Sequence, residues 1–176
     1  MITSRRNFVA GGALLTAAGI AEATRAEDAV ADGTTFKLEV IGRVELKGAA
    51  AAIRLFDAYA EGLLGLEQWS HVQVLYWFDK NDTPDKRKVL RVHPRGNREN
   101  PLTGVFACRS PFRPNLIGLT VCRIVGVEGG VVRVDALDAF DGTPVLDLKP
   151  FTPADAPLQG VKVPTWARRG PGGPGK

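Results

Sequence analysis

The sequence contains few of the residues that build metal centres or disulfide frameworks. Its 176 residues include two cysteines and two histidines, and none of them has the spacing of a zinc site. Cys108 and Cys122 each lie in apolar surroundings, which predicts two small buried side chains, with a disulfide between them as the alternative if the protein is exported. A disulfide-rich scaffold is excluded, and a metal site is not expected.

The N-terminus lacks an apolar run long enough for a transmembrane helix. The stretch over residues 9–21 is about 13 residues long, whereas a helix needs about 20 to cross the hydrocarbon layer. It follows Arg5 and Arg6 and precedes small-residue patterns typical of a cleavage site near Ala26. These features resemble a twin-arginine export signal. We therefore predict a signal peptide over residues 1–26 and a periplasmic or secreted protein without stable membrane insertion; a cytoplasmic protein is the alternative.

A strong excess of either charge is also absent. The formal net charge is +4, but the chain without residues 1–26 retains 20 basic and 18 acidic residues. Such a small excess is weak evidence for a nucleic-acid partner. No G-x-G-x-x-G turn follows the first predicted strand, which argues against a doubly wound dinucleotide-binding fold.

Short strands separated by turns dominate the remaining sequence. Apolar alternation and β-branched or aromatic runs predict strands at 36–46, 51–56, 71–78, 88–93, 104–108, 117–127, 131–137 and 144–148. Residues 57–69 contain two glycines, so they are expected to form at most one or two helical turns. With no long amphipathic helix, the pattern predicts a mainly β barrel or sandwich. A polar linker over 27–35 precedes this domain, and a Pro/Gly-rich tail over 156–176 follows it.

Residues 109–115, here called the Arg–Pro segment, place two arginines between and beside two prolines. Pro111 and Pro114 restrict the backbone on both sides, so Arg109 and Arg113 are held out with little conformational freedom. Their planar donor groups suit carboxylates, phosphates and aromatic bases, and Asn115 can both donate and accept. The alternative is a rigid crossover whose arginines only pair with acidic loops.

Aspartates are concentrated over residues 135–150. The turn sequence Asp141-Gly142 alone explains Asp141, but not Asp138 or the alternation of Asp147 with Lys149. Carboxylates near the Arg–Pro segment could bind an amino group or hydroxyls of a ligand.

The strand predicted over 71–78 supplies most of the large aromatic side chains. We expect the aromatic residues Trp69, Tyr76, Trp77 and Phe78 to lie in the core. His71 is expected to be a structural residue. Asp79 and Lys80 end this strand at a rim, where functional groups are common.

Three motifs in order carry a resemblance to a known family. "EGLLGLEQWSHVQVLYWF", "GVFACRSPFRPNLIGL" and "DAFDGTPVLDLKPF" resemble the TsaA-like family of TrmO-type tRNA methyltransferases, over residues 36 to about 153. The resemblance implies a small TsaA-like β-barrel domain over 36–155 with short helical connections and a homodimer. It also implies S-adenosylmethionine as the cofactor, bound near the subunit interface, and N6 of threonylcarbamoyladenosine in tRNA as the methyl acceptor.

The resemblance also implies positions for the site. The cofactor-binding residues it gives are Asp79, Lys80, Arg109, Leu119, Asp138, Ala139, Phe140 and Asp141. Arg113, Asn115 and Lys149 are candidate substrate contacts. No metal is implied, and no catalytic residue is assigned, because methyl transfer from a sulfonium depends mainly on positioning.

Three departures from the family pattern leave the function open. The Pro-Arg-Gln triplet that follows the first strand in tRNA-modifying members is missing here, and Cys108 replaces the usual threonine before Arg109. The export signal is a third departure, since tRNA and S-adenosylmethionine are cytoplasmic. We expect an exported methyltransferase-like protein with an unknown acceptor; the alternatives are a cytoplasmic tRNA methyltransferase with a misread start and a non-catalytic small-molecule-binding module.

Overall fold

The computed structural model describes residues 35–48, 50–152, 154 and 160–167. The chain divides into two units, Met1–Lys37 and Leu38–Lys176, and the strands lie in the second. The predicted signal peptide over 1–26, most of the linker and part of the tail lie outside the described residues. The domain boundaries given above stay predictions.

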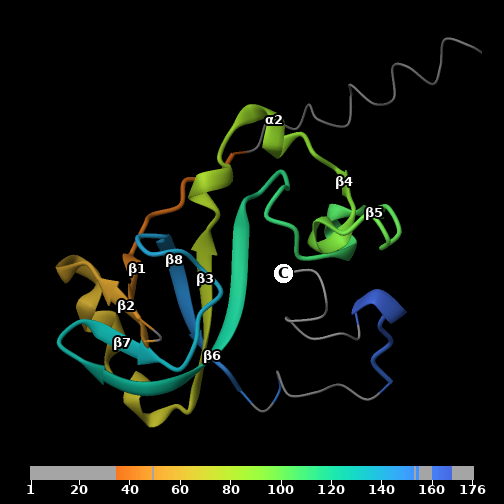
Figure 1. Ribbon diagram of the computed structural model, residues 1–176. Helices are drawn as coiled ribbons and strands as arrows, with labels where there is room; N and C mark the ends of the chain where they lie inside the picture. Colours follow the sequence, from red (N-terminus) through yellow and green to blue (C-terminus); the bar gives the residue numbers. More distant parts are fainter. Residues whose placement is uncertain (1–34, 49, 153, 155–159, 168–176) are drawn as a thin grey trace, which may run out of the picture. The chain divides into compact units, whose positions relative to one another are not determined.

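Six antiparallel strands of the second unit close into a barrel (Figure 1). They follow one another around the barrel in the order β1-β2-β7-β6-β3-β8. Their bounds are β1 Gly42–Lys47, β2 Ala50–Leu55, β3 His71–Trp77, β6 Ile117–Glu128, β7 Val131–Val134 and β8 Pro144–Pro150. The predicted mainly β barrel is therefore confirmed.

Buried side chains from the barrel strands fill the interior, and in β3 they alternate strictly with half-buried ones. In β3, Val72, Val74 and Tyr76 are buried while the residues between them are half-buried. Ile53 of β2 and Val145 of β8 have no exposed surface at all and join them in one core cluster. Because successive side chains of a strand point to opposite faces, a one-residue slip would place this apolar set outside, and the burial pattern thereby fixes the register.

A long excursion between β3 and β6 lies outside the barrel sheet. It contains the helix α2 (Pro84–Arg87) and a two-stranded ribbon of β4 (Arg91–Val92) and β5 (Thr103–Gly104), which Figure 1 shows beside the barrel. The strand predicted over 88–93 is thus reduced to two residues. The strand predicted over 104–108 is wrong beyond its first residue.

A short 3-10 helix replaces that strand. Val105 is 1% exposed, but Phe106 and Ala107 after it are both exposed, so the side chains do not alternate as they would in a strand. The described 3-10 helices are Asp57–Leu63, Leu66–Gln68, Asp79–Asn81, Pro94–Gly96, Val105–Ala107 and Thr165–Ala167. The first two confirm the short helical turns expected over 57–69.

Several sequence expectations need correction in the barrel. The first strand begins at Gly42, and Phe36 and Leu38 are exposed. Trp69, which we expected in the core, is 40% exposed, because it ends a 3-10 helix at the surface. Tyr76 is buried as expected, and Trp77 and Phe78 are half-buried.

The two cysteines differ in their surroundings. Cys122 is 1% exposed within the core, as predicted, whereas Cys108 is only half-buried; both are free thiols. Within the described residues there is no cluster of three or more potential metal ligands. The same part of the chain contains no helix with the length and apolar character needed to cross a membrane.

Candidate functional site

The side chain of Tyr76 joins three parts of the chain at one end of β3. Its hydroxyl donates to the backbone carbonyl of Asp138 at 2.7 Å and lies 3.2 Å from the hydroxyl oxygen of Thr120. The ring covers Gly118, where a Cβ would lie 2.4 Å from a ring carbon. Burial raises the pKa of Tyr76, so the hydroxyl stays protonated. The tyrosine therefore anchors the β7–β8 connection against β3 and β6.

The charges of Arg109 and Asp138 have opposite effects on the pKa of Tyr76. The charge of Asp138 raises the pKa of Tyr76 and that of Arg109 lowers it, both less than burial does. Arg109 also donates from Nη1 to the carbonyl of Leu119 at 3.4 Å. Arg109, Leu119 and Asp138, which come from two of the motifs, are thus connected through β6 and Tyr76, and all three are exposed.

Lys80 and Phe140 form a second link between predicted site residues. The ammonium of Lys80 lies 4.0 Å from the centroid of the Phe140 ring, which is a cation–π contact. Phe140 is 61% exposed, so one face of a large aromatic ring remains available. Asp79 begins the 3-10 turn that carries Lys80, and Ala139 packs against the core. This contact connects the turn after β3 to the β7–β8 connection.

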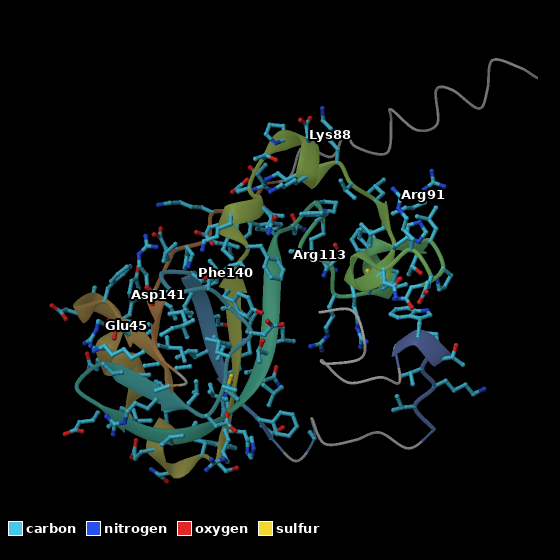
Figure 2. All side chains as sticks on the ribbon, viewed as in Figure 1. Glu45, Lys88, Arg91, Arg113, Phe140 and Asp141 are labelled. Atoms are coloured by element: carbon cyan, nitrogen blue, oxygen red, sulfur yellow. The ribbon has the colours of Figure 1, made fainter. Side chains whose placement is uncertain are left out.

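Two other predicted residues have partners outside this group. The carboxylate of Asp141 accepts from the backbone N–H of Leu46 at 2.8 Å, so it ties the β7–β8 connection to β1. Lys149 forms an ion pair with Asp147 at 2.8 Å on β8, which raises the pKa of Lys149. Figure 2 shows Asp141 beside Glu45, on the β1 side of Phe140. Their roles toward a ligand stay predictions.

The Arg–Pro segment is folded partly onto itself. Arg113 donates from Nη2 to the carbonyl of Val105 at 3.4 Å and is half-buried. The hydroxyl of Ser110 accepts from the N–H of Phe112, and the carbonyl of Asn115 accepts from the N–H of Ile117. These hydrogen bonds give the loop a defined conformation, and Arg109 contacts the barrel through the carbonyl of Leu119.

Sequence reasoning missed a cluster on the excursion after β3. The carboxylate of Asp82 accepts from the indole N–H of Trp77 at 3.0 Å and from Arg87 at 2.7 and 3.1 Å. Arg87 and then Trp77 lower the pKa of Asp82. Arg87 also donates to the carbonyl of Pro114 at 3.1 Å. The Thr83-Pro84 pair, a helix N-cap followed by proline at N1, was the signal that α2 begins here.

Positive charge is concentrated on the excursion, although the whole chain is nearly balanced. Residues 84–113, here called the basic segment, contain eight Lys and Arg residues but only two Asp and Glu residues. Figure 2 shows Lys88 and Arg91 on this part of the chain, away from the barrel, and both are exposed. Averaging over the chain hides this local excess.

A cavity of about 500 Å³ lies elsewhere, between β8 and residues 57–69. The residues that line it include the apolar side chains of Leu63, Leu66 and Trp69 and the carboxylate residue Asp147. None of the predicted site residues lines this cavity. The predicted site is instead an open surface that carries a cation, a carboxylate and an aromatic ring.

The protein is therefore a small antiparallel β-barrel with an open surface that carries charged and aromatic side chains. Residues 42–156 match the family model of the tRNA-methyltransferase O N-terminal domain. Since the match covers more than half of the chain, the chain belongs to this TrmO family.

Individual relatives agree with this assignment. A probable S-adenosyl-L-methionine-binding protein of Methanocaldococcus jannaschii is 44% identical over 117 residues, which cover 66% of this chain and 93% of the relative. The human tRNA (adenine(37)-N6)-methyltransferase is 46% identical over 99 residues, 56% of this chain but only 22% of that protein. A crystal structure of TrmO from Pseudomonas aeruginosa matches with a TM-score of 0.58 and 29% identity, covering 76% of this chain and 62% of that one.

Proposed function

We propose that this chain binds S-adenosylmethionine on the open surface beside Tyr76 and acts as a TrmO-type methyltransferase. The observation that carries the proposal is a series of contacts: Tyr76 donates to the carbonyl of Asp138 and packs on Gly118, and Arg109 donates to the carbonyl of the next residue, Leu119. The names of the relatives support the same cofactor, since one is a probable S-adenosyl-L-methionine-binding protein and another a tRNA methyltransferase.

The groups on this surface fit the chemistry of the cofactor. Arg109 makes one long hydrogen bond of 3.4 Å, so most of its donors remain for a carboxylate. The carboxylate of Asp138 accepts no hydrogen bond within the described residues, and a carboxylate suits an amino group or ribose hydroxyls. The exposed ring of Phe140 suits an adenine face.

The contribution of the chain to the reaction is to bind and orient. When bound, S-adenosylmethionine supplies an activated methyl group on a sulfonium. Holding the acceptor in line with that methyl converts an encounter between two molecules into a reaction within one complex. The transfer requires no protein nucleophile, and we assign no general base.

The charge distribution favours an RNA acceptor. The basic segment carries eight cations and includes Arg109 of the proposed cofactor site. Cations at such density are the usual contacts for a phosphate backbone. Together with the human relative, named for adenine 37 of tRNA, this supports N6 of a tRNA adenine as the acceptor.

Two alternatives make different predictions. If the predicted signal over residues 1–26 exports the chain, the acceptor is not tRNA, since tRNA is cytoplasmic. If the chain is a binding module, it binds S-adenosylmethionine but transfers no methyl group to any acceptor. A methylation assay together with a binding assay separates these outcomes.

The test is methyl transfer by the purified full chain from labelled S-adenosylmethionine to tRNA from a strain that lacks TrmO activity. We expect label in N6 of the modified adenine. A Lys88→Ala/Arg91→Ala double variant should methylate tRNA more weakly and with a smaller salt dependence, yet bind S-adenosylmethionine normally. The matched control, Lys47→Ala/Arg133→Ala, removes two exposed cations outside the basic segment. Binding without any transfer to tRNA would refute this acceptor.

A further inference from the structure

Arg87 contacts three separate parts of the chain with one side chain. Its Nε and Nη2 donate to the carboxylate of Asp82 at 2.7 and 3.1 Å, and its Nη1 donates to the carbonyl of Pro114 at 3.1 Å. Its guanidinium carbon lies 5.2 Å from the centroid of the Trp77 ring. All three nitrogen atoms of the guanidinium are therefore engaged, on the end of β3, on the turn after it and on the Arg–Pro segment.

Lys86 repeats the same connection one residue earlier. Its ammonium donates to the carbonyl of Lys80 and to the side-chain oxygen of Asn81, both at 3.1 Å. It also lies 5.6 Å from the centroid of the Phe112 ring. Both basic residues that end α2 thus connect the turn over residues 79–82, here called the rim turn, with the Arg–Pro segment.

The two connected elements carry predicted cofactor-binding residues. The rim turn contains Asp79 and Lys80, and the Arg–Pro segment contains Arg109. The β3–β6 ladder brings the two elements side by side as far as Phe78, whose N–H donates to the carbonyl of Leu116 at 2.8 Å. The ladder does not continue between residues 79–82 and 109–115, and there the side chains of Lys86 and Arg87 connect them. The distance between Lys80 and Arg109 therefore depends on α2 as well as on the barrel.

We propose that Asp82 and Arg87 are positioning residues, which hold the rim turn and the Arg–Pro segment in the arrangement that binds S-adenosylmethionine. This inference rests on the proposed function. The side chain of Arg87 is 37% exposed and that of Asp82 is 39% exposed, and exposed ion pairs contribute little to the stability of a fold. Losing the pair should therefore change the site much more than it changes the stability of the barrel.

The geometry requires arginine and not merely a positive charge. A guanidinium presents a planar fork of donors, so it reaches a carboxylate and a carbonyl at once, whereas an ammonium is a compact charge on a flexible stem. Arg87→Lys keeps the charge but cannot reproduce both sets of bonds. This variant separates positioning from simple electrostatic attraction.

The experiment compares the full-length wild type with Arg87→Ala, Arg87→Lys and Asp82→Asn. Calorimetric titration gives the affinity for S-adenosylmethionine, thermal melting gives stability, and amide hydrogen exchange of residues 105–115 without ligand gives local order. The matched control is Glu45→Gln, which breaks the similarly exposed Glu45–Arg54 pair on β1 and β2, away from both elements.

We expect each of the three variants to bind about tenfold more weakly, which corresponds to about 1.4 kcal/mol. Their melting temperatures should fall by no more than about 3 °C, and exchange over 109–115 should become several-fold faster. Glu45→Gln should change neither affinity nor exchange in that segment. If Arg87→Lys behaves as the wild type, charge rather than position matters and the inference is wrong.

Hydrogen exchange separates failure of this inference from failure of the proposed function. If the wild type does not bind S-adenosylmethionine but Arg87→Ala still exchanges faster over 109–115, the proposed function fails and the link between the two elements stands. If the wild type binds and the variants bind equally well, the positioning role is refuted. Unchanged exchange in every variant refutes the link itself.

Discussion

The hydroxyl of Tyr76 and the backbone carbonyl of Asp138 lie 2.7 Å apart, although the two residues are 62 positions apart in the chain. The Tyr76 ring also packs edge-on against Phe78, with 5.5 Å between ring centroids. Asp138 lies in the connection between β7 and β8, outside the ladders of the barrel. A buried phenol therefore fixes a loop that carries four of the predicted cofactor-binding residues.

Substituting Gly118 tests this packing directly. A Cβ at this position would lie 2.4 Å from the Tyr76 ring, so Gly118→Ala should reduce the free energy of unfolding by about 1–3 kcal/mol. Gly62→Ala is the matched control, because its Cβ would meet nothing within 4 Å, and it should be neutral or slightly stabilising. Urea denaturation measures both. Equal stability of the two variants would contradict the packing described here.

Arg109 and Asp138 should affect the ligand and not the fold. A charge-assisted hydrogen bond contributes about 1.5–3 kcal/mol, so Arg109→Ala and Asp138→Asn should each lower the affinity for S-adenosylmethionine roughly tenfold to a hundredfold. Both side chains are exposed, so melting temperatures should hardly change. Arg133→Ala, an exposed arginine on β7, is the control. Variants that melt earlier but bind normally would leave only a structural role for these residues.

The barrel was largely predictable from the sequence because burial alternates with period two. "HVQVLYW" has this pattern, and β3 follows it over its whole length. The excursion was less predictable, because Leu90 and Phe106 are apolar yet exposed, and the apolar runs that contain them were interpreted as strands. α2 is only four residues long, too short to give a helical period.

The site was predictable in part, and only through the family resemblance. The motifs identified Arg109, Leu119 and Asp138, and in the structure Arg109 donates to the carbonyl of Leu119 while Tyr76 donates to the carbonyl of Asp138. Tyr76 itself was expected only as a core residue, because sequence cannot show where a hydroxyl points. The Asp82–Arg87 pair was missed because a charged loop is usually solvated, and its partner Pro114 accepts through a backbone carbonyl.

The two thiols should react at different rates. Burial, more than the nearby charge of Asp135, raises the pKa of Cys122 to about 11, so at pH 8 its reactive thiolate is scarce and shielded. Cys108 is half-buried. Iodoacetamide should modify Cys108 first, and Cys122 only in denaturant or as the pH rises toward 11, where the neutral buried thiol no longer stabilises the fold. Mass spectrometry of peptides measures this; equal rates, or no reaction before reduction, would contradict it.

Export through the twin-arginine route, the alternative to a tRNA acceptor, is predicted from the apolar run over residues 9–21, the small-residue patterns near Ala26 and the pair Arg5 and Arg6. Replacing both with lysine should keep the full-length precursor in the cytoplasm, whereas the wild type should appear outside it, cleaved near Ala26. Fractionation with immunoblotting measures this. An Arg25→Lys variant is the control, because it removes an arginine of the same region outside the pair. Normal export of the double variant, or a wild type that never leaves the cytoplasm, would refute the signal.

Binding of S-adenosylmethionine to the purified full chain, measured by calorimetric titration, tests the central claim most directly. Only Gly48 and residue 49 separate β1 from β2, where the resemblance places a Pro-Arg-Gln contact in tRNA-modifying members. We therefore predict saturable binding at one site per chain, weaker than that of Pseudomonas aeruginosa TrmO measured alongside, with each tenfold in affinity corresponding to about 1.4 kcal/mol. Absence of binding at millimolar cofactor, while the relative binds under the same conditions, would contradict the account.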